Sequence, residues 1–157
     1  MTKPIPDGFH AITPVFVFKD SHKAIEFYKE AFAATEQCVM PCPDGQGVMH
    51  AELKIGDSTI MLGDENPTYP CKSAETLGGS PISLYLYVKD VDAAFRRALA
   101  AGGTVKMPVQ DMFWGDRVGS LSDPFGYSWT LATHVADLSP EEMTRGAEAA
   151  FAGTGKT

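Results

Sequence analysis

The sequence contains an internal duplication, and this repeat constrains the fold more than any other feature. The stretch 15–32, VFVFKDSHKAIEFYKEAF, matches 84–103, LYLYVKDVDAAFRRALAAGG, in the order of a strand, a Lys-Asp pair and a helix. A repeat of roughly 70 residues that occurs only twice is too long for a solenoid unit and indicates two copies around a pseudo-twofold axis. The offset that relates Asp20 to Asp90 also relates Ala24 to Ala94, Ile25 to Phe95, Gly56 to Gly126 and Ser58 to Ser128.

The first copy, 10–64, predicts a βαβββ module. Thr13 to Phe18 is a β-branched and aromatic run, and the Asp20 side chain that follows it can cap a helix. Apolar residues then recur at helical spacing from Ala24 to Phe32, which predicts an amphipathic helix that packs on a sheet. Two further runs, Val48 to Ile55 and Ser58 to Leu62, flank Gly56-Asp57 and predict a hairpin.

The second copy, 82–134, repeats this order, and 65–81 is a Pro-, Gly- and Ser-containing linker without periodicity. A C-terminal helix is expected over 138–151, because Ser139 suits the N-cap position and is followed by Pro and two Glu residues. We therefore predict one α+β domain over 1–157, with two tandem βαβββ modules that form a curved mixed sheet around a cavity. The sequence leaves open whether the cavity lies within one chain or is shared between two.

Composition limits the partners that such a domain can have. The chain is 44% hydrophobic over 157 residues, enough for a buried core, and has no apolar run or N-terminal signal that predicts membrane insertion or secretion. Its net charge of −7 without a Lys/Arg cluster argues against nucleic acid and favours a small-molecule ligand. Three cysteines without a C-x-x-C pair, Cys38, Cys42 and Cys71, suit reduced thiols, and we expect a cytoplasmic protein.

Four sequence segments resemble those of a known protein superfamily. The IEFYKEAF helix, the HAELKIGDSTIML hairpin, the FWGDRVG loop and the DPFGYSWTLATH strand are similar to those of the vicinal oxygen chelate superfamily. That superfamily includes glyoxalase I, bleomycin-resistance proteins, fosfomycin-resistance enzymes and extradiol dioxygenases, and the PhnB-like branch is the most similar part of it. The resemblance runs from about Ile5 to Glu142, and it also implies a homodimer.

The resemblance implies where a divalent metal ion would bind. Enzymes of this superfamily hold the ion with His, Glu or Gln from the first and last strands of each module. Transferred to this sequence, those positions fall on Thr13, Ile60, Ser83 and Thr130. Hydroxyl groups are weak neutral ligands and an isoleucine cannot coordinate, so we expect no metal and no other cofactor.

His50 and Glu52 are the fallback candidates for metal binding or acid–base chemistry, because residues two apart share one face of a strand. If Gly56-Asp57 is a two-residue turn, Leu53 pairs with Ile60, and His50 and Glu52 lie on the opposite side. A bulge would reverse this. Both a structural and a pocket role therefore stay open for this pair.

Other candidate ligand contacts come from the second copy. The loop from Met112 to Arg117 offers Trp114 for stacking and Arg117 for carboxylate or phosphonate oxygens, unless Asp116 and Arg117 pair internally. Tyr85 and Tyr87 alternate with leucines and place their hydroxyls on the side of Ser83, which we expect to line the cavity.

Three functions are compatible with these residues, and the sequence identifies no catalytic group. The first is metal-free binding of a small molecule, with Thr13, Ile60, Ser83, Tyr85, Trp114, Arg117 and Thr130 as candidate contacts. The second is a divalent-metal-dependent, glyoxalase-like lyase or isomerase with displaced ligands. The third is a metal-free acid–base enzyme that uses Glu52 or a tyrosine. The residues at the metal positions favour the first.

Overall fold

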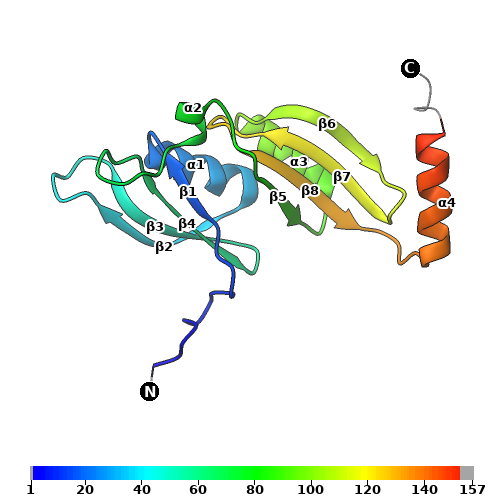
Figure 1. The fold of residues 1–157 in the computed structure, drawn as a ribbon, viewed down its shortest axis with the longest axis horizontal. Coiled ribbons are helices and arrows are strands. Elements are labelled where there is room, and N and C mark those ends of the chain that lie inside the picture. Colours follow the sequence, from blue (N-terminus) through cyan, green and yellow to red (C-terminus); the bar gives the residue numbers. More distant parts are fainter. Residues whose placement is uncertain (1, 153–157) are drawn as a thin grey trace.

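The computed structural model describes residues 2–152 and contains two four-stranded sheets with helices packed on one side (Figure 1). The α+β fold with two tandem modules is therefore confirmed. The elements of the first module are β1 (Val15–Phe18), α1 (Ser21–Phe32), β2 (Thr35–Pro41), β3 (Val48–Ile55) and β4 (Ser58–Asp64). After α2 (Ala74–Leu77), the second module has β5 (Ser83–Tyr87), α3 (Val91–Ala100), β6 (Thr104–Asp111), β7 (Asp116–Ser122) and β8 (Ser128–His134), and α4 (Pro140–Phe151) follows.

The two sheets have the same topology, which explains the sequence repeat. Their strand orders are β1-β4-β3-β2 and β5-β8-β7-β6, and in each the first strand of the module runs parallel to the last. The remaining pairs are antiparallel, so both sheets are mixed. The helix of each module supplies the crossover that a parallel pair requires.

Aspartate caps begin the two equivalent helices. The Asp20 side chain accepts a hydrogen bond from the Lys23 N–H, and Asp90 accepts one from the Ala93 N–H. Each cap satisfies a backbone donor that the first helical turn leaves without a partner. α4 begins with a full capping box between Ser139 and Glu142, as its sequence indicates.

Two elements have no clear signal in the sequence. β2 lies at a sheet edge and is mostly exposed, so its residues show no clear apolar alternation. α2 lies within the stretch 65–81 and is a single turn, too short for helical periodicity. Its cap is nevertheless well formed, because Ser73 Oγ accepts a hydrogen bond from the Thr76 N–H.

The two modules pack against each other through their helices and share one core. α1 contacts α3, and the Arg97 guanidinium donates to the Ala31 carbonyl at 3.0 Å. The Phe16 ring stacks near Trp129 of the other module, with ring centroids 5.9 Å apart. Figure 1 shows both helices behind the two sheets, which lie side by side.

Hydrogen bonds also join the two modules inside this core. The Tyr28 hydroxyl of α1 donates to the carboxylate of Asp123, between β7 and β8, at 2.7 Å. The Tyr127 hydroxyl donates to the Val17 carbonyl at 2.9 Å. Because these contacts combine directional bonds with a buried aromatic core, they fix how the two sheets are oriented.

The opposite side of each sheet is not covered by a helix, and we call it the open face. In β5, Ser83, Tyr85 and Tyr87 are exposed on this face, while Leu84 and Leu86 pack toward the core. The sheets lie side by side in Figure 1, and the two open faces look outward. Where the modules meet, Val15 of the first face and Ser83 of the second line one cavity of about 310 Å³.

We expect Tyr28→Phe to lower the free energy of unfolding by about 1–3 kcal/mol, because the buried Asp123 carboxylate would lose a donor. Urea unfolding measures this change. The matched control is Tyr69→Phe, since Tyr69 is 66% exposed and its change should stay within about 0.5 kcal/mol. Equal stabilities of the two variants would contradict a stabilising role for the Tyr28–Asp123 bond.

Candidate functional site

The open face of the second module carries hydroxyl groups from three neighbouring strands. Tyr85 on β5 lies beside Thr130 on β8, and the Thr130 hydroxyl is 2.9 Å from that of Ser120 on β7. Ser83 also lies on this face, next to Ser128. The structure therefore brings together Ser83, Tyr85 and Thr130 of the candidate contacts predicted from the sequence.

Asp116, at the start of β7, is the centre of a hydrogen-bond network at one end of this face. Its side chain is 5% exposed. Its Oδ2 atom accepts from the Tyr85 hydroxyl at 3.1 Å, the Tyr87 hydroxyl at 2.9 Å and Trp114 Nε1 at 3.2 Å. Its Oδ1 atom is 2.8 Å from His134 Nδ1. Two aromatic hydroxyls, an indole and an imidazole thus converge on one carboxylate, which we call the Asp116 cluster.

The Asp116 carboxyl favours its ionised form. Burial raises its pKa, but the hydrogen bonds from His134, Tyr87, Tyr85 and Trp114 lower it more, and the net pKa lies below the usual value. The Asp116 carboxyl is therefore negatively charged at neutral pH, and it lies beside an imidazole whose own pKa is raised.

A glycine positions the loop that carries Trp114. Gly115 has φ of 95°, and a Cβ at this position would collide with the Ala136 carbonyl. The Gly115 carbonyl accepts hydrogen bonds from the N–H groups of Val135 and Ala136, which follow β8. The Met112–Asp116 turn is thereby held against the end of β8, next to His134.

The two tyrosines of the cluster keep their protons near neutral pH. Burial, with further contributions from Asp116, raises the pKa of Tyr85 to about 12. The hydrogen bond to Asp116 raises the pKa of Tyr87. Neither hydroxyl is therefore suited to act as a general base at neutral pH, which weakens the acid–base hypothesis for a tyrosine.

Arg117 does not take part in this network. Its guanidinium donates to Asp92 at 2.8 and 3.0 Å and to Asp111 at 3.0 Å. The internal Asp116–Arg117 pair considered from the sequence is not formed, because successive strand residues point to opposite faces of the sheet. Asp116 pairs with His134 on the open face, whereas Arg117 contacts Asp92 of α3 on the helix side.

The register of the first module separates Ile60 from the open face. The two-residue turn pairs Leu53 with Ile60, as the sequence predicted, and both are buried on the helix side. Ile60 lines a cavity of about 250 Å³ near Leu84 and Trp129, between the modules. Met61 of β4, which pairs with Glu52 of β3 and Val15 of β1, lies on the open face.

The sequence offset that relates Asp20 to Asp90 does not relate structurally equivalent positions of β4 and β8, because the two hairpins differ in loop length. β3 and β4 are joined by Gly56 and Asp57, which pairs Ile55 with Ser58 on the helix side. β7 and β8 are joined by the longer loop 123–127, which pairs Ser122 with Ser128 on the open face. A one-residue change of register exchanges the two faces of a strand, so Ile60 and Thr130 point to different sides.

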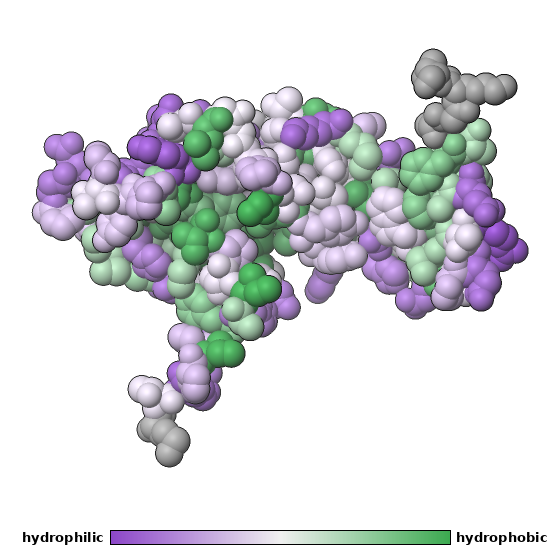
Figure 2. All heavy atoms as spheres, in the orientation of Figure 1, coloured by the Kyte–Doolittle hydropathy of each residue, from purple (hydrophilic) through white to green (hydrophobic). Residues whose placement is uncertain are grey.

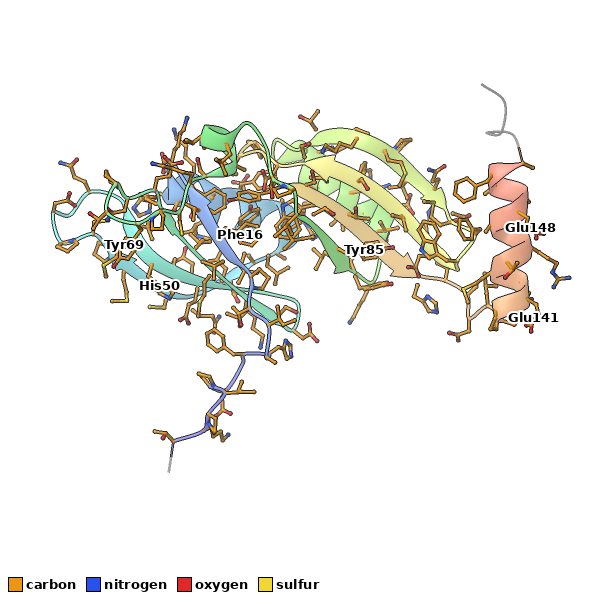
Figure 3. All side chains as sticks on the ribbon, in the orientation of Figure 1. Phe16, His50, Tyr69, Tyr85, Glu141 and Glu148 are labelled. Carbon is orange, nitrogen blue, oxygen red and sulfur yellow. The ribbon has the colours of Figure 1, made fainter. Side chains whose placement is uncertain are left out.

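The side chains of His50 and Glu52 point to the face of the sheet that Ile60 does not occupy, which is the open face of the first module. Their side chains are 35% and 25% exposed, with His50 Nε2 3.2 Å from Glu52 Oε1. His50 borders a shallow cavity of about 290 Å³ that Val15 and Tyr69 also line. Figure 3 shows His50 and Tyr69 over the first sheet and Tyr85 beside β5 of the second.

The side chains at the metal positions do not fit a divalent ion. Thr13 lies just before β1, and its hydroxyl donates to the His10 carbonyl at 3.4 Å. Ser83 and Thr130 offer only neutral hydroxyls, and neither Ile60 nor Met61 is a strong ligand for a hard cation. Within residues 2–152 of one chain, no three His, Cys, Asp or Glu side chains converge as a metal site.

Residues 9–131 match the family model of the Glyoxalase/Bleomycin resistance protein/Dioxygenase superfamily. The chain therefore belongs to this superfamily, in agreement with the open-faced βαβββ modules described above. It is 42% identical to the protein Mb0911c of Mycobacterium bovis over 136 residues, which covers 85% of this chain and 89% of that protein.

Solved structures that share this fold include a PhnB protein and a fosfomycin resistance protein. The PhnB protein of Bacillus cereus, described as a putative 3-demethylubiquinone-9 3-methyltransferase, is 22% identical, with a TM-score of 0.60 and coverage of 79% of this chain and 99% of that one. A variant of the fosfomycin resistance protein FosX of Listeria monocytogenes, solved with Mn(II) and a dihydroxypropylphosphonic acid, is 18% identical. Its TM-score is 0.59, with coverage of 85% and 93%. These similarities show the fold and leave the ligand open.

We expect His134 to make stability depend on pH. Hydrogen bonds to Asp137 and Asp116 raise the pKa of its imidazole. Because the folded pKa lies above the unfolded one, the stabilisation is complete below about pH 6.5 and is lost as pH rises through the folded pKa. The difference in unfolding free energy between the natural protein and His134→Gln should therefore shrink from about pH 5.5 to about pH 8.5.

Urea unfolding at several pH values and an NMR titration of the His134 ring check this prediction. Asp137→Asn is the matched variant, and it should lower the pKa of His134 because it removes one carboxylate. An imidazole that titrates at or below about pH 6.5 in the natural protein would contradict it.

Proposed function

We propose that this protein binds a small organic molecule without a metal ion, in a cavity that two copies of the chain form between their open faces. The observation that carries the proposal is the set of side chains at the metal positions, Thr13, Met61, Ser83 and Thr130, none of which is a strong ligand. Ser83, Tyr85, Trp114 and Thr130 provide polar and aromatic contacts for such a molecule, and Ile60 stays a contact only through the intermodule cavity.

The exposure of the open faces supports a homodimer. Val15 is 69% exposed on the first module, and Tyr85 and Tyr87 are 47% and 61% exposed on the second. Figure 2 shows apolar side chains over the first sheet and the boundary between the sheets. The exposed side chains of Ile12 and Ile82 line cavities formed by residues of both modules. Apolar and aromatic groups at this density favour burial against another surface.

The chemistry of the cysteines supports a cytoplasmic location. Cys38, Cys42 and Cys71 are all free thiols. Such thiols are stable in a reducing compartment. In addition, none of the helices described within residues 2–152 has the length and hydrophobicity to cross a membrane.

The alternative is a divalent-metal-dependent lyase or isomerase with displaced ligands. The contact between His50 and Glu52 on the open face favours this alternative, because an imidazole and a carboxylate are common metal ligands. A metal site needs at least three strong ligands, so a second chain would have to supply the third. Among residues 2–152 of one chain, no third strong ligand joins this pair, and we therefore prefer the metal-free function.

We expect protein purified without a metal-chelating tag to contain substoichiometric divalent metal and to show no marked thermal stabilisation by Mn²⁺, Ni²⁺ or Zn²⁺. The reason is that one strong ligand pair cannot hold an ion against competition from buffer and water. Elemental analysis and thermal-shift assays measure both quantities. A stoichiometric ion that is lost in His50→Ala but kept in His10→Ala would instead support the metal-dependent alternative.

We expect Val15→Lys to weaken the homodimer by about tenfold or more, because the charged side chain would be placed in the buried centre of the proposed interface. Concentration-dependent light scattering measures the dissociation constant. The matched control is Val105→Lys, which changes an exposed valine on β6 whose neighbour on β7 is the core residue Leu121. A monomeric natural protein, or equal effects of both substitutions, would contradict pairing through the open faces.

A further inference from the structure

We infer that the Asp116 cluster selects a ligand that carries a protonated amine. This inference deepens the proposed function and rests on it, since it assumes that the open face of the second module binds a small molecule. It concerns the chemical class of the ligand at one end of that face, where Tyr85, Tyr87 and Trp114 surround Asp116.

The first reason is that the hydrogen-bond donors of the cluster are already used. Tyr85, Tyr87 and Trp114 all donate to Asp116 Oδ2. A tyrosine hydroxyl has one proton, and a tryptophan indole has a single N–H. The two hydroxyl oxygens can therefore offer only their lone pairs to a ligand. A carboxylate or phosphonate would find no donor on these three side chains, whereas an ammonium group would find two acceptors.

The second reason is the arrangement of the aromatic rings. The centroids of the Tyr85 and Tyr87 rings are 5.2 Å apart, with planes inclined by 51°. Both residues remain about half exposed or more, so a ligand can reach the rings. Aromatic rings attract cations over their faces, and a phenol that donates a hydrogen bond to a carboxylate is richer in electrons than a free one.

The third reason is the electrostatics around Asp116. Its ionised carboxylate lies at the hydroxyl ends of the two tyrosine rings. Arg117 is bound by Asp92 and Asp111 on the other side of the sheet. Lys106 donates to Ser128, at the opposite end of β8 from His134. Of the described residues, His134 is the only basic one hydrogen-bonded to Asp116. Its other ring nitrogen lies 3.0 Å from the Asp137 carboxylate, so two carboxylates outweigh one imidazolium when His134 is protonated.

The experiment compares three ligands that share one ring and differ in charge. Benzylamine, which is protonated at neutral pH, benzyl alcohol and benzoate are titrated into the full-length protein at constant ionic strength. Two-dimensional ¹⁵N–¹H NMR follows the Trp114 indole N–H and the backbone amides of Tyr85 and Tyr87. We expect the affinity to fall from the amine to the alcohol to benzoate, with the amine about tenfold tighter than the alcohol.

Two variants test whether the cluster causes this preference. The double variant Tyr85→Phe/Tyr87→Phe removes both acceptor oxygens but keeps the rings at exposed positions, and should reduce the amine-to-alcohol ratio to about threefold or less. Asp116→Asn removes the buried charge and should reduce the ratio similarly. The matched control Glu30→Gln removes one negative charge from an exposed position on α1 of the first module, and should leave the ratio unchanged.

The outcomes separate this inference from the proposed function. Benzoate binding as tightly as benzylamine, or an amine preference that survives in both cluster variants, would overturn the inference and leave small-molecule binding intact. Shifts on the open face that leave Tyr85, Tyr87 and Trp114 unperturbed would also overturn the inference alone. If none of the three ligands perturbs the open face, both the inference and the proposed binding role of this face fail. Because the tyrosine variants change exposed residues, the test does not depend on Asp116→Asn folding correctly.

Discussion

The orientation of the two modules depends on one buried carboxylate, that of Asp123. It accepts hydrogen bonds from Tyr28 of the first module and from Trp129 Nε1 of the second, and from the N–H groups of Phe125 and Tyr127. A buried carboxylate with fewer partners would be strongly destabilising, so the modules are held in the one arrangement that satisfies it. That arrangement places both helices in the shared core and turns both open faces outward. The hydrogen bonds of Asp123 on the helix side of the sheets therefore determine where the open faces, and any binding surface on them, are located.

Asp116 and Asp123 show how similar carboxylates acquire different roles. Both are buried and bonded to aromatic side chains. For Asp123, burial raises the pKa and its hydrogen bonds do not fully offset this effect. For Asp116, the hydrogen bonds prevail over burial, and the neighbouring His134 is half exposed. Asp123 thus stabilises the core, whereas Asp116 maintains a negative charge next to a surface that a ligand can reach.

The sequence allowed the fold to be predicted almost completely, because its signals are local. The caps at Asp20 and Asp90, the amphipathic helices and the hairpin turn all act within a few residues. The site could be predicted only in part. The alternation in β5 placed Tyr85 correctly beside Ser83, but the position of Ile60 depended on a register difference between the two hairpins. The partners of Asp116 and Arg117 come from other strands and from α3, and no local pattern indicates which of them a side chain will meet.

The duplication kept the topology of the modules and allowed their open faces to diverge. The first face carries the apolar side chains of Val15 and Met61 beside the His50–Glu52 pair. The second is lined by hydroxyls, with Asp116 at one end. In a symmetric homodimer, the open face of the first module of one copy could face the open face of the second module of the other. This arrangement would give two equivalent cavities. Each would have one apolar wall and one polar wall. Such a cavity matches an amphipathic molecule whose apolar body lies on the first face and whose polar group reaches the second. If the two modules had kept identical open faces, a symmetric homodimer would have cavities with two identical walls. Divergence between the two halves of the gene can therefore produce cavities whose two walls differ.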